Sequence, residues 1–366
     1  MSEEGVQRLV ALFEQQVAEE LHPGAQLVVL RHGQVVVDRA IGLADVKKKR
    51  PVTPDTPFLT FSVTKPIAGI CLHRLIEEGK VAMDAPIATY WPEFGKAGKE
   101  EATIRHAFLH QAGIPTRGLN LQVLHWTSWA RVTRNVAGLT AEYSPGSQIA
   151  YHLVNYGFIV GEVVRRVSGM PIDAYLRENF LEPMGLRNSW LGIPRHELAR
   201  AARLYCGHPQ QRNATILFSF PFIRGAVIPA ATFNSTAREV AIFFQMMLNE
   251  GHYAGRRYLE PETLATATSL GAEGHDGIIG GVRRWGYGFE LGGANPAIGL
   301  EPHEVGMGKK SSLRTFGHFG NATCMAWADW DTGLVVTFTC NRLLSSSDSR
   351  KRWRALSDAV WDSLKR

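Results

Sequence analysis

The run AQLVVLRHGQVVVDRAI, residues 25–41, decides the architecture that this sequence predicts. Its two halves, 25–31 and 35–41, are rich in β-branched and aliphatic residues, which favours extended strands. They meet at His32-Gly33-Gln34, a short glycine-containing connection that is typical of a β-hairpin. Before this hairpin, apolar residues recur at helical spacing over residues 4–21. The chain is therefore expected to begin with a helix and two antiparallel strands.

The other end of the chain mirrors this pattern. Residues 323–329 and 334–341 are β-rich and flank a turn at 330–333. A helix is expected to follow, because apolar residues from Trp353 to Leu364 fall on one stripe. Strands at both ends with helices between them indicate one antiparallel sheet built from both chain ends and flanked by helices. The expected fold class is α+β.

A mostly helical inserted subdomain is expected to account for the middle of the chain. We place the sheet domain at residues 1–80 and 230–366 and the helical subdomain at 81–229. Two further stretches, 205–230 and 271–312, are long and turn-rich, as loops at the border of a functional site often are. Helical periodicity or a helix-ending glycine predicts helices over 67–78, 155–167 and 172–180.

Composition narrows the class of protein. Of the 366 residues, 45% are hydrophobic and 20% charged, as in ordinary globular proteins. No apolar run approaches the roughly 18 residues of a membrane span, and the first residues are acidic where a secretory signal would be basic. Four widely spaced cysteines form no Cys-x-x-Cys pair, so we expect reduced thiols and no metal site. The net charge of +6 is scattered apart from two basic clusters, 47–50 and 350–352, which are expected to be solvated surface rather than a nucleic-acid site. We expect a soluble, cytoplasmic protein that uses no cofactor.

The segment Ser62-Val63-Thr64-Lys65 carries residues suited to nucleophilic catalysis. Serine is a weak nucleophile at its ordinary pKa and needs a neighbouring proton acceptor. Residues three apart share one face of a helix, so Lys65 is expected to point at the Ser62 hydroxyl. Backbone N–H groups at a helix start also suit a developing oxyanion. The alternative is a helix-capping serine followed by an exposed lysine.

Further motifs follow this segment in order along the chain. They are LIEEGKV (75–81), LHQAGIP (109–115), YSPGS (143–147), YHLVNYG (151–157), NSTARE (234–239) and FGHFGN (316–321). Together with the Ser-x-x-Lys motif, they resemble the serine β-lactamase-like superfamily, which includes class C β-lactamases and D-alanyl-D-alanine carboxypeptidases. The resemblance is strongest to family VIII carboxylesterases and runs from about residue 5 to residue 362.

The resemblance implies a role for each matching residue. Ser62 is the nucleophile, Lys65 is the lysine of the Ser-x-x-Lys motif, and Tyr151 is the tyrosine of the second motif. The segment 317–320 matches the edge strand that usually reads Lys-Thr-Gly or His-Thr-Gly. The backbone N–H groups of Ser62 and Asn321 would form the oxyanion hole. An ammonium favours tyrosinate while desolvation favours neutral lysine, so the sequence leaves open which of the two is the base.

Departures from the family pattern concern the residues implied to bind substrate, namely Leu153, His318, Phe319 and Gly320. Leu153 replaces an asparagine that binds the amide of penicillin-like substrates, and leucine makes no hydrogen bond. His318 replaces a lysine that can hold a substrate carboxylate, and histidine is mostly neutral at pH 7. Phe319 replaces a threonine hydroxyl. These departures favour a neutral carboxylic ester as substrate. His318 has a second predicted role, the positioning of the water that releases the acyl group.

The expected function is a serine hydrolase that forms an acyl-enzyme on Ser62 and acts on short-to-medium-chain carboxylic esters, its small-molecule partners. Hydrolysis of β-lactams or D-amino peptides and acyl transfer are alternatives, and a non-catalytic binding domain is a remote one. The sequence does not fix the oligomeric state. An apolar acyl pocket is predicted from aromatic residues in the variable segments: Trp126, Trp129, Phe218, Phe220, Phe222, Trp285, Tyr287 and Phe316.

Overall fold

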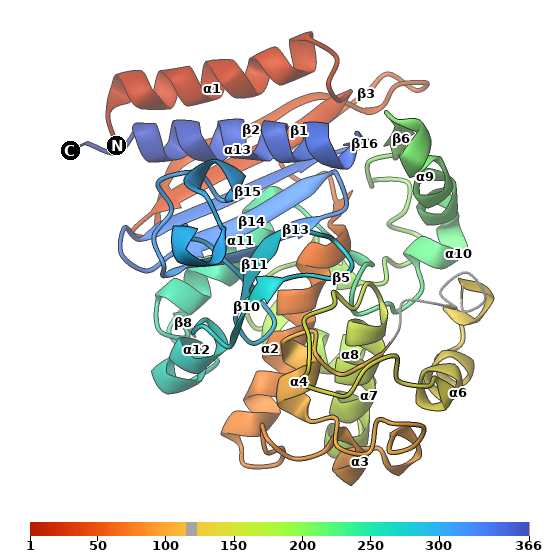
Figure 1. Ribbon diagram of the computed structural model, residues 1–366. Helices are drawn as coiled ribbons and strands as arrows, with labels where there is room; N and C mark the ends of the chain where they lie inside the picture. Colours follow the sequence, from red (N-terminus) through yellow and green to blue (C-terminus); the bar gives the residue numbers. More distant parts are fainter. Residues whose placement is uncertain (115–122, 366) are drawn as a thin grey trace.

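A nine-stranded antiparallel sheet forms the centre of the computed structural model, which describes residues 1–114 and 123–365 (Figure 1). The strands run in the spatial order β10-β11-β12-β13-β14-β15-β1-β2-β3. Their bounds are β10 Ala272–His275, β11 Val282–Trp285, β12 Glu290–Leu291, β13 Thr315–Gly320, β14 Cys324–Asp329, β15 Leu334–Cys340, β1 Gly24–Arg31, β2 Gln34–Asp45 and β3 Arg50–Pro51.

Strands from the two ends of the chain are neighbours in this sheet. β1 pairs with β15 from Ala25 opposite Cys340 to Arg31 opposite Leu334. On its other side β1 pairs with β2 in the hairpin expected at His32-Gly33-Gln34. All residues of β1 except Arg31 are buried, because the strand has a neighbour on each side and is covered on both faces. The α+β class and the sheet built from both chain ends are confirmed.

One face of the sheet is covered by the first and last helices, which lie side by side (Figure 1). These are α1, Glu3–Ala18, and α13, Ser346–Asp362. Phe13 of α1 packs edge-on against Phe338 of β15, with ring centroids 6.2 Å apart. Trp361 of α13 stacks on Trp327 of β14 at 5.3 Å. The apolar stripes read from the sequence are thus the surfaces that these helices bury.

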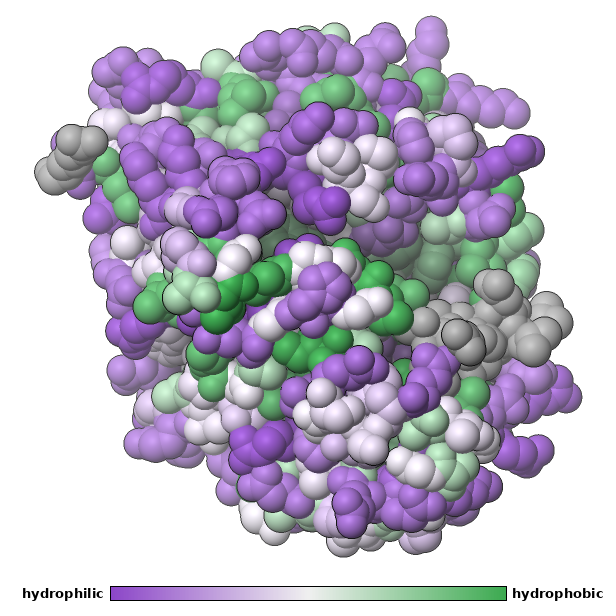
Figure 2. All heavy atoms as spheres, in the orientation of Figure 1, coloured by the Kyte–Doolittle hydropathy of each residue, from purple (hydrophilic) through white to green (hydrophobic). Residues whose placement is uncertain are grey.

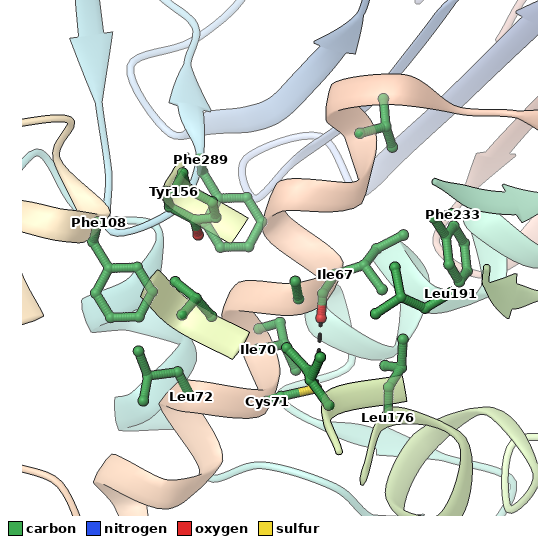
Figure 3. Close-up of a cluster of buried hydrophobic side chains, with 14 of the residues drawn as sticks. Ile67, Ile70, Cys71, Leu72, Phe108, Tyr156, Leu176, Leu191, Phe233 and Phe289 are labelled. Atoms are coloured by element: carbon green, nitrogen blue, oxygen red, sulfur yellow. Dashed lines mark hydrogen bonds between the residues drawn. The ribbon is translucent and has the colours of Figure 1, made fainter. Parts of the chain in front are cut away.

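The opposite face is covered by α11, Ala237–Leu248, which packs on β1, β14 and β15. Beside it lies α2, Thr64–Glu77, which is buried on most sides. Figure 3 shows Ile67, Ile70 and Leu72 of α2 among side chains from the surrounding elements. α2 packs closely on α7, Asn155–Ser168, because a Cβ on Gly69 would come within 2.8 Å of the Tyr156 hydroxyl oxygen. The nucleophile segment therefore opens a helix held firmly inside the protein.

The remaining helices surround α2 and α7 or line the connections. They are α3 Ile87–Tyr90, α4 Ile104–Phe108, α6 Trp129–Gly138, α8 Ile172–Leu176, α9 Arg212–Ser219, α10 Pro221–Arg224 and α12 Pro261–Ala267. Small sheets pair β4 Phe58–Leu59 and β5 Trp190–Leu191 with β7 Phe233–Ser235, β6 Tyr205–Cys206 with β16 Arg342–Leu343, and β8 His252–Tyr253 with β9 Arg256–Arg257. In the described part of the chain, no helix is both long and apolar enough to cross a membrane.

The two stretches expected to be loops contain regular structure. Residues 271–312 supply β10, β11 and β12, which extend the sheet beyond β13. These strands have only two to four residues and carry glycine and charged residues, so they show no alternating pattern in the sequence. Residues 205–230 contain α9 and α10. The division into a sheet domain and a helical subdomain stays a prediction, and Pro115 of the LHQAGIP motif lies outside the described residues.

Candidate active site

Ser62 lies where the chain turns from β4 into α2. It is the middle residue of the 3₁₀ turn η1, Phe61–Val63. Phe61 has a φ of +43°, a left-handed conformation that is energetically unfavourable for a residue with a side chain. The Thr64 hydroxyl donates to the Phe61 carbonyl and accepts from the Phe233 N–H, which holds this conformation. Such strain beside a serine is typical of a functional position.

Lys65 is fully buried and points back at Ser62. Its Nζ lies 3.1 Å from Ser62 Oγ, as the spacing of the motif predicts. The same nitrogen donates to the carbonyl oxygens of Leu153 at 2.7 Å and Ala230 at 3.5 Å. Burial lowers the pKa of Lys65 well below its usual value. Among the described residues, no carboxylate forms an ion pair with this amine, so none favours its charged form.

Tyr151 lies in the loop just before α7 and is 5% exposed. Its ring centroid is 4.5 Å from Lys65 Nζ, and its phenol shares a hydrogen bond with the Ser62 side chain. Burial raises the pKa of Tyr151, and the Ser62 bond offsets only part of that rise. The ring stacks on Trp285 with centroids 5.6 Å apart. Residues far apart in the sequence thus bring a hydroxyl, an amine and a phenol together.

The pKa directions assign charge states to this group. Burial disfavours both the ammonium form of Lys65 and the phenolate form of Tyr151. Burial therefore favours the neutral form of each side chain. A neutral amine has two N–H bonds for the two carbonyls and a lone pair for the Ser62 hydroxyl. This arrangement favours Lys65 as the group that accepts the serine proton.

Two buried histidines support the loop that carries Tyr151. His110 Nδ1 accepts the backbone N–H of His152 at 3.2 Å, and the His110 ring lies 4.6 Å from that of Tyr151. His152 Nδ1 donates to the Ala150 carbonyl at 2.6 Å, while its Nε2 accepts the Ile114 N–H at 3.3 Å. Burial lowers the pKa of His152 to about 4. Both imidazoles are bound to the backbone, so they fix the position of Tyr151.

The end of β13 packs directly against η1. A Cβ on Gly320 would come within 2.1 Å of the Thr60 carbonyl oxygen, so only glycine fits there. Cys324 Sγ also donates to that oxygen, at 2.7 Å. Thr60 lies two residues before Ser62, and Gly320 immediately precedes Asn321. The segments that carry the two predicted oxyanion-hole N–H groups are thus in contact.

His318 is the predicted binding residue that the structure brings to the catalytic group. Its ring centroid lies 5.9 Å from that of Tyr151, and its side chain is 3% exposed. Burial, followed by the charge of Lys65, lowers its pKa to about 3. Because Nδ1 donates to the Phe319 carbonyl at 2.8 Å, Nε2 of the neutral ring is an acceptor. Both predicted roles of His318 would use this nitrogen.

Phe319 and Leu153 are placed differently. The ring of Phe319 stacks on Trp353 of α13 at 5.0 Å and belongs to the hydrophobic cluster on the far face of the sheet. The structure therefore does not bring Phe319 to Ser62. Leu153 contributes its carbonyl to Lys65, while its side chain is 39% exposed. A leucine matches this contact because any residue supplies a carbonyl, and substrate binding by Leu153 and Gly320 stays a prediction.

Three of the predicted pocket aromatics lie beside the catalytic group. Phe218 packs edge-on against Phe61 at 5.0 Å, and Trp126 follows at 6.2 Å from Phe218. Trp285 stacks on the ring of Tyr151. Figure 2 shows the surface hollowed between the end of β13 and α9–α10, with hydrophobic residues on both sides.

The other predicted aromatics pack against different partners. Phe220 and Phe222 stack on each other at 5.2 Å and are exposed on the α9–α10 surface. The rest pack elsewhere: Trp129 on Phe158 and Glu162, Tyr287 on Arg105, and Phe316 on Phe244. Trp126, Phe218 and Trp285 remain the candidates for the acyl pocket, which stays a prediction.

Two groups that support the site were not predicted from the sequence. The Ala230 carbonyl binds Lys65, and Asp276 Oδ1 accepts the Tyr151 backbone N–H at 3.2 Å. Asp276 also accepts from Ile278 and Ile279, and the turn-forming pair Asp276-Gly277 was the only signal for it. In residues 1–114 and 123–365 no group of three or more histidine, cysteine, aspartate or glutamate side chains could hold a metal ion.

Comparisons with known proteins agree with this geometry. The family model described as Beta-lactamase matches residues 9–360. The chain is 29% identical to "Esterase/beta-lactamase LipL" of Mycobacterium tuberculosis, covering 88% of this chain and 78% of that protein. It is 31% identical to "Esterase EstB" of Burkholderia gladioli over 50% of each chain.

Two solved structures match over the whole chain. The "family VIII carboxylesterase" has a TM-score of 0.86 and 26% identity, with 100% of this chain and 99% of that one covered. A "Penicillin-Binding Protein (PBP) Homolog" from Caulobacter crescentus has a TM-score of 0.83, 29% identity and the same coverage. The match of the family model over nearly the whole length shows that the chain belongs to the β-lactamase family, with esterases among its relatives.

Proposed function

We propose that this protein is a carboxylic ester hydrolase that forms an acyl-enzyme on Ser62. The observation that carries the proposal is the position of a buried lysine amine, whose pKa is lowered by burial, 3.1 Å from the Ser62 hydroxyl oxygen. A capping serine with an exposed lysine, the alternative that the motif left open, does not fit a lysine that is 0% exposed. A binding domain would have no use for an uncompensated buried amine beside a hydroxyl.

The reaction follows from the contacts. The Ser62 proton moves to Lys65 Nζ as Oγ attacks the ester carbonyl carbon, and the carbonyl oxygen becomes an oxyanion. The N–H groups of Ser62 and Asn321 stabilise that oxyanion. Its collapse breaks the bond to the alkoxide, which takes a proton from the Tyr151 phenol, and the phenol regains one from the Lys65 ammonium. Water then attacks the acyl group by the reverse proton path and releases the acid and Ser62.

An ester is favoured over a lactam or a peptide by the groups beside Ser62. The pKa of His318, lowered to about 3 by burial, leaves a neutral ring with no charge to hold a substrate carboxylate. Leu153 offers no side-chain hydrogen bond to an amide. Trp126 and Phe218 supply an apolar surface for a short or medium acyl chain. The esterase names of two relatives support the same substrate class.

The test combines turnover with a covalent label. Purified protein is assayed with p-nitrophenyl acetate, butyrate and octanoate and with nitrocefin, and then treated with a fluorophosphonate and digested for mass spectrometry. We expect ester turnover, little nitrocefin turnover and an adduct on the Ser62 peptide. Ser62→Ala should lower ester turnover by roughly 1,000-fold or more. Ser269→Ala, an exposed serine, is the matched control and should leave turnover unchanged.

Two results would contradict the proposal. Efficient nitrocefin turnover with no ester turnover would assign a β-lactamase activity, and an adduct elsewhere would remove Ser62 as the nucleophile. Adding methanol to the assay separates hydrolysis from acyl transfer, because transfer yields the methyl ester. We also propose a cytoplasmic location, which is supported by the four free cysteines, three of them buried.

A further inference from the structure

The turn between β13 and β14 carries Asn321 and is held in an unfavourable conformation. The Thr323 N–H donates to the Gly320 carbonyl at 2.9 Å and closes a four-residue turn. Ala322, the third residue of this turn, has a φ of +56°, a region that favours glycine. A residue with a Cβ keeps such a conformation only where its surroundings hold it there.

The group that holds Ala322 from inside is Arg352 of α13. This guanidinium donates through one terminal nitrogen to the Ala322 carbonyl. Its other terminal nitrogen lies 3.3 Å from His22 Nδ1, and its carbon sits 5.4 Å from the centroid of the Phe338 ring. A charged donor makes a stronger bond to a carbonyl than a neutral one does. Arg352 therefore fixes the orientation of the peptide group between Ala322 and Thr323, one residue beyond Asn321.

The burial of Arg352 and its lack of an acidic partner in the part of the chain that the structure describes support this role. Its side chain is 3% exposed, and it forms no ion pair with a carboxylate of the described residues. A buried guanidinium without an acidic partner is costly, and nonpolar residues of similar size would fill the space at lower cost. Such residues could not replace its bond to the Ala322 carbonyl or its contact with His22.

A second contact holds the turn through the side chain of Asn321. Asn321 Nδ2 donates to Gln211 Oε1 at 3.1 Å, and Gln211 Nε2 lies 3.3 Å from Asn321 Oδ1. This reciprocal amide pair joins the turn to the start of α9. The same helix carries Phe218, which packs on Phe61 beside the nucleophile. α9 thus contacts the chain on both sides of the predicted oxyanion hole.

We propose that Arg352 and Gln211 are positioning residues that hold the β13–β14 turn so that the Asn321 N–H faces the reacting carbonyl oxygen. The proposal rests on the ester hydrolysis proposed above. Neither residue touches substrate; both act through the backbone of residues 321 and 322. Because an oxyanion donor acts only when charge develops on the substrate oxygen, loss of this alignment lowers kcat and leaves KM nearly unchanged.

The experiment measures kcat and KM for p-nitrophenyl butyrate in Arg352→Met, Arg352→Lys, Gln211→Ala and Asn321→Ala, each corrected for active sites counted with a fluorophosphonate. We expect Arg352→Met to lower kcat by roughly 10- to 100-fold with KM within about 3-fold. Arg352→Lys should recover part of the loss, since an ammonium can still donate to the carbonyl. Gln211→Ala and Asn321→Ala, which keeps its backbone N–H, should each lower kcat by about 3- to 10-fold.

Inhibition by phenylboronic acid separates positioning from a structural role. Its adduct with Ser62 is tetrahedral and anionic, so its inhibition constant should rise by about the same factor as kcat falls. A residue needed only for folding would lower the melting temperature and leave both quantities per active site unchanged. Lys351→Met and Gln210→Ala are exposed neighbours on the same elements and serve as controls.

The outcomes are distinct. Unchanged kcat and boronate affinity in Gln211→Ala, in Asn321→Ala and in folded Arg352→Met would overturn this inference. If Arg352→Met fails to fold, the kcat and boronate affinity of the Gln211 and Asn321 variants decide whether the inference stands. Ser62→Ala in the same series tests the underlying reaction separately: turnover that survives in Ser62→Ala would refute the proposed function, whatever the turn variants do.

Discussion

Lys65 and Lys99 are two buried lysines that differ in one contact. Both are 0% exposed, and neither forms an ion pair with a carboxylate of the described residues. Lys99 Nζ donates to the carbonyls of Lys96, at 2.8 Å, and Leu139. It also lies 5.3 Å from the centroid of an aromatic ring, that of Phe94. Lys65 has two carbonyls and an aromatic ring as well, and in addition the hydroxyl of a serine.

This difference shows that burial alone does not make a base. Burial lowers the pKa of both lysines, and that of Lys65 falls further; at Lys99 the charge of Glu100 raises the pKa while that of Lys96 lowers it. The carbonyl contacts of Lys99 tie one loop to the end of α6, which is a structural role. Only at Lys65 does the lone pair of a neutral amine meet a group with a proton to give up. The comparison therefore assigns function to the Ser62 contact rather than to the buried amine.

The largest expected effect separates the two lysines by activity. Lys65→Met should lower kcat/KM for p-nitrophenyl butyrate by roughly 1,000-fold or more, because the Ser62 hydroxyl loses its proton acceptor. Lys99→Met should leave kcat/KM within about 3-fold, since its contacts hold only a loop. Steady-state assays of folded protein measure both. Equal losses in the two variants would show that a buried lysine matters here only for structure.

The aromatic partners of the two lysines give the next test. Tyr151→Phe keeps the ring and removes the hydroxyl that bonds to Ser62, so kcat should fall by about 100- to 10,000-fold. Phe94→Leu changes the ring beside Lys99 and should affect stability without changing kcat. If Tyr151→Phe retained most of its activity, the phenol would only be packing against Lys65.

The pH dependence of turnover identifies the base. With Lys65 as the base, kcat/KM should rise with pH through an inflection below the usual lysine pKa, because burial lowers the pKa of Lys65. Burial raises the pKa of Tyr151, so ionisation of the phenol should cause no second change up to about pH 10. The residual activity of Tyr151→Phe should keep the same rising limb. A limb that disappears in this variant would make tyrosinate the base.

The sequence predicted the parts of this site whose signals are local. A three-residue spacing on a helix brings Lys65 to Ser62, and the paired β-rich ends of the chain predict the sheet beneath them. Tyr151 could be placed only through its resemblance to a family motif, because no local rule brings residue 151 to residue 62. The carbonyls of Leu153 and Ala230 carry no residue signature, since every residue has one. The packing of Phe319 on Trp353 depends on which face of β13 meets α13, and a lone edge-strand motif does not fix that.

A stability measurement gives the smallest effect and refines the comparison of the two lysines. Because burial lowers the pKa of Lys65, the unfolded chain holds a proton over a pH range in which the folded chain does not, so wild-type stability rises with pH across that range. Lys65→Met has no such proton. The free energy of unfolding of Lys65→Met should therefore rise relative to that of the wild type as pH falls below the usual lysine pKa of 10.5, by about 1.4 kcal/mol per pH unit, until the pKa of folded Lys65 is reached. Lys99→Met should show the same sign over a narrower range, because the pKa of Lys99 is lowered less.

Denaturant unfolding of the three proteins at half-unit steps of pH measures these differences. A pH-independent difference between Lys65→Met and the wild type would mean that Lys65 stays charged in the folded protein and cannot accept the Ser62 proton.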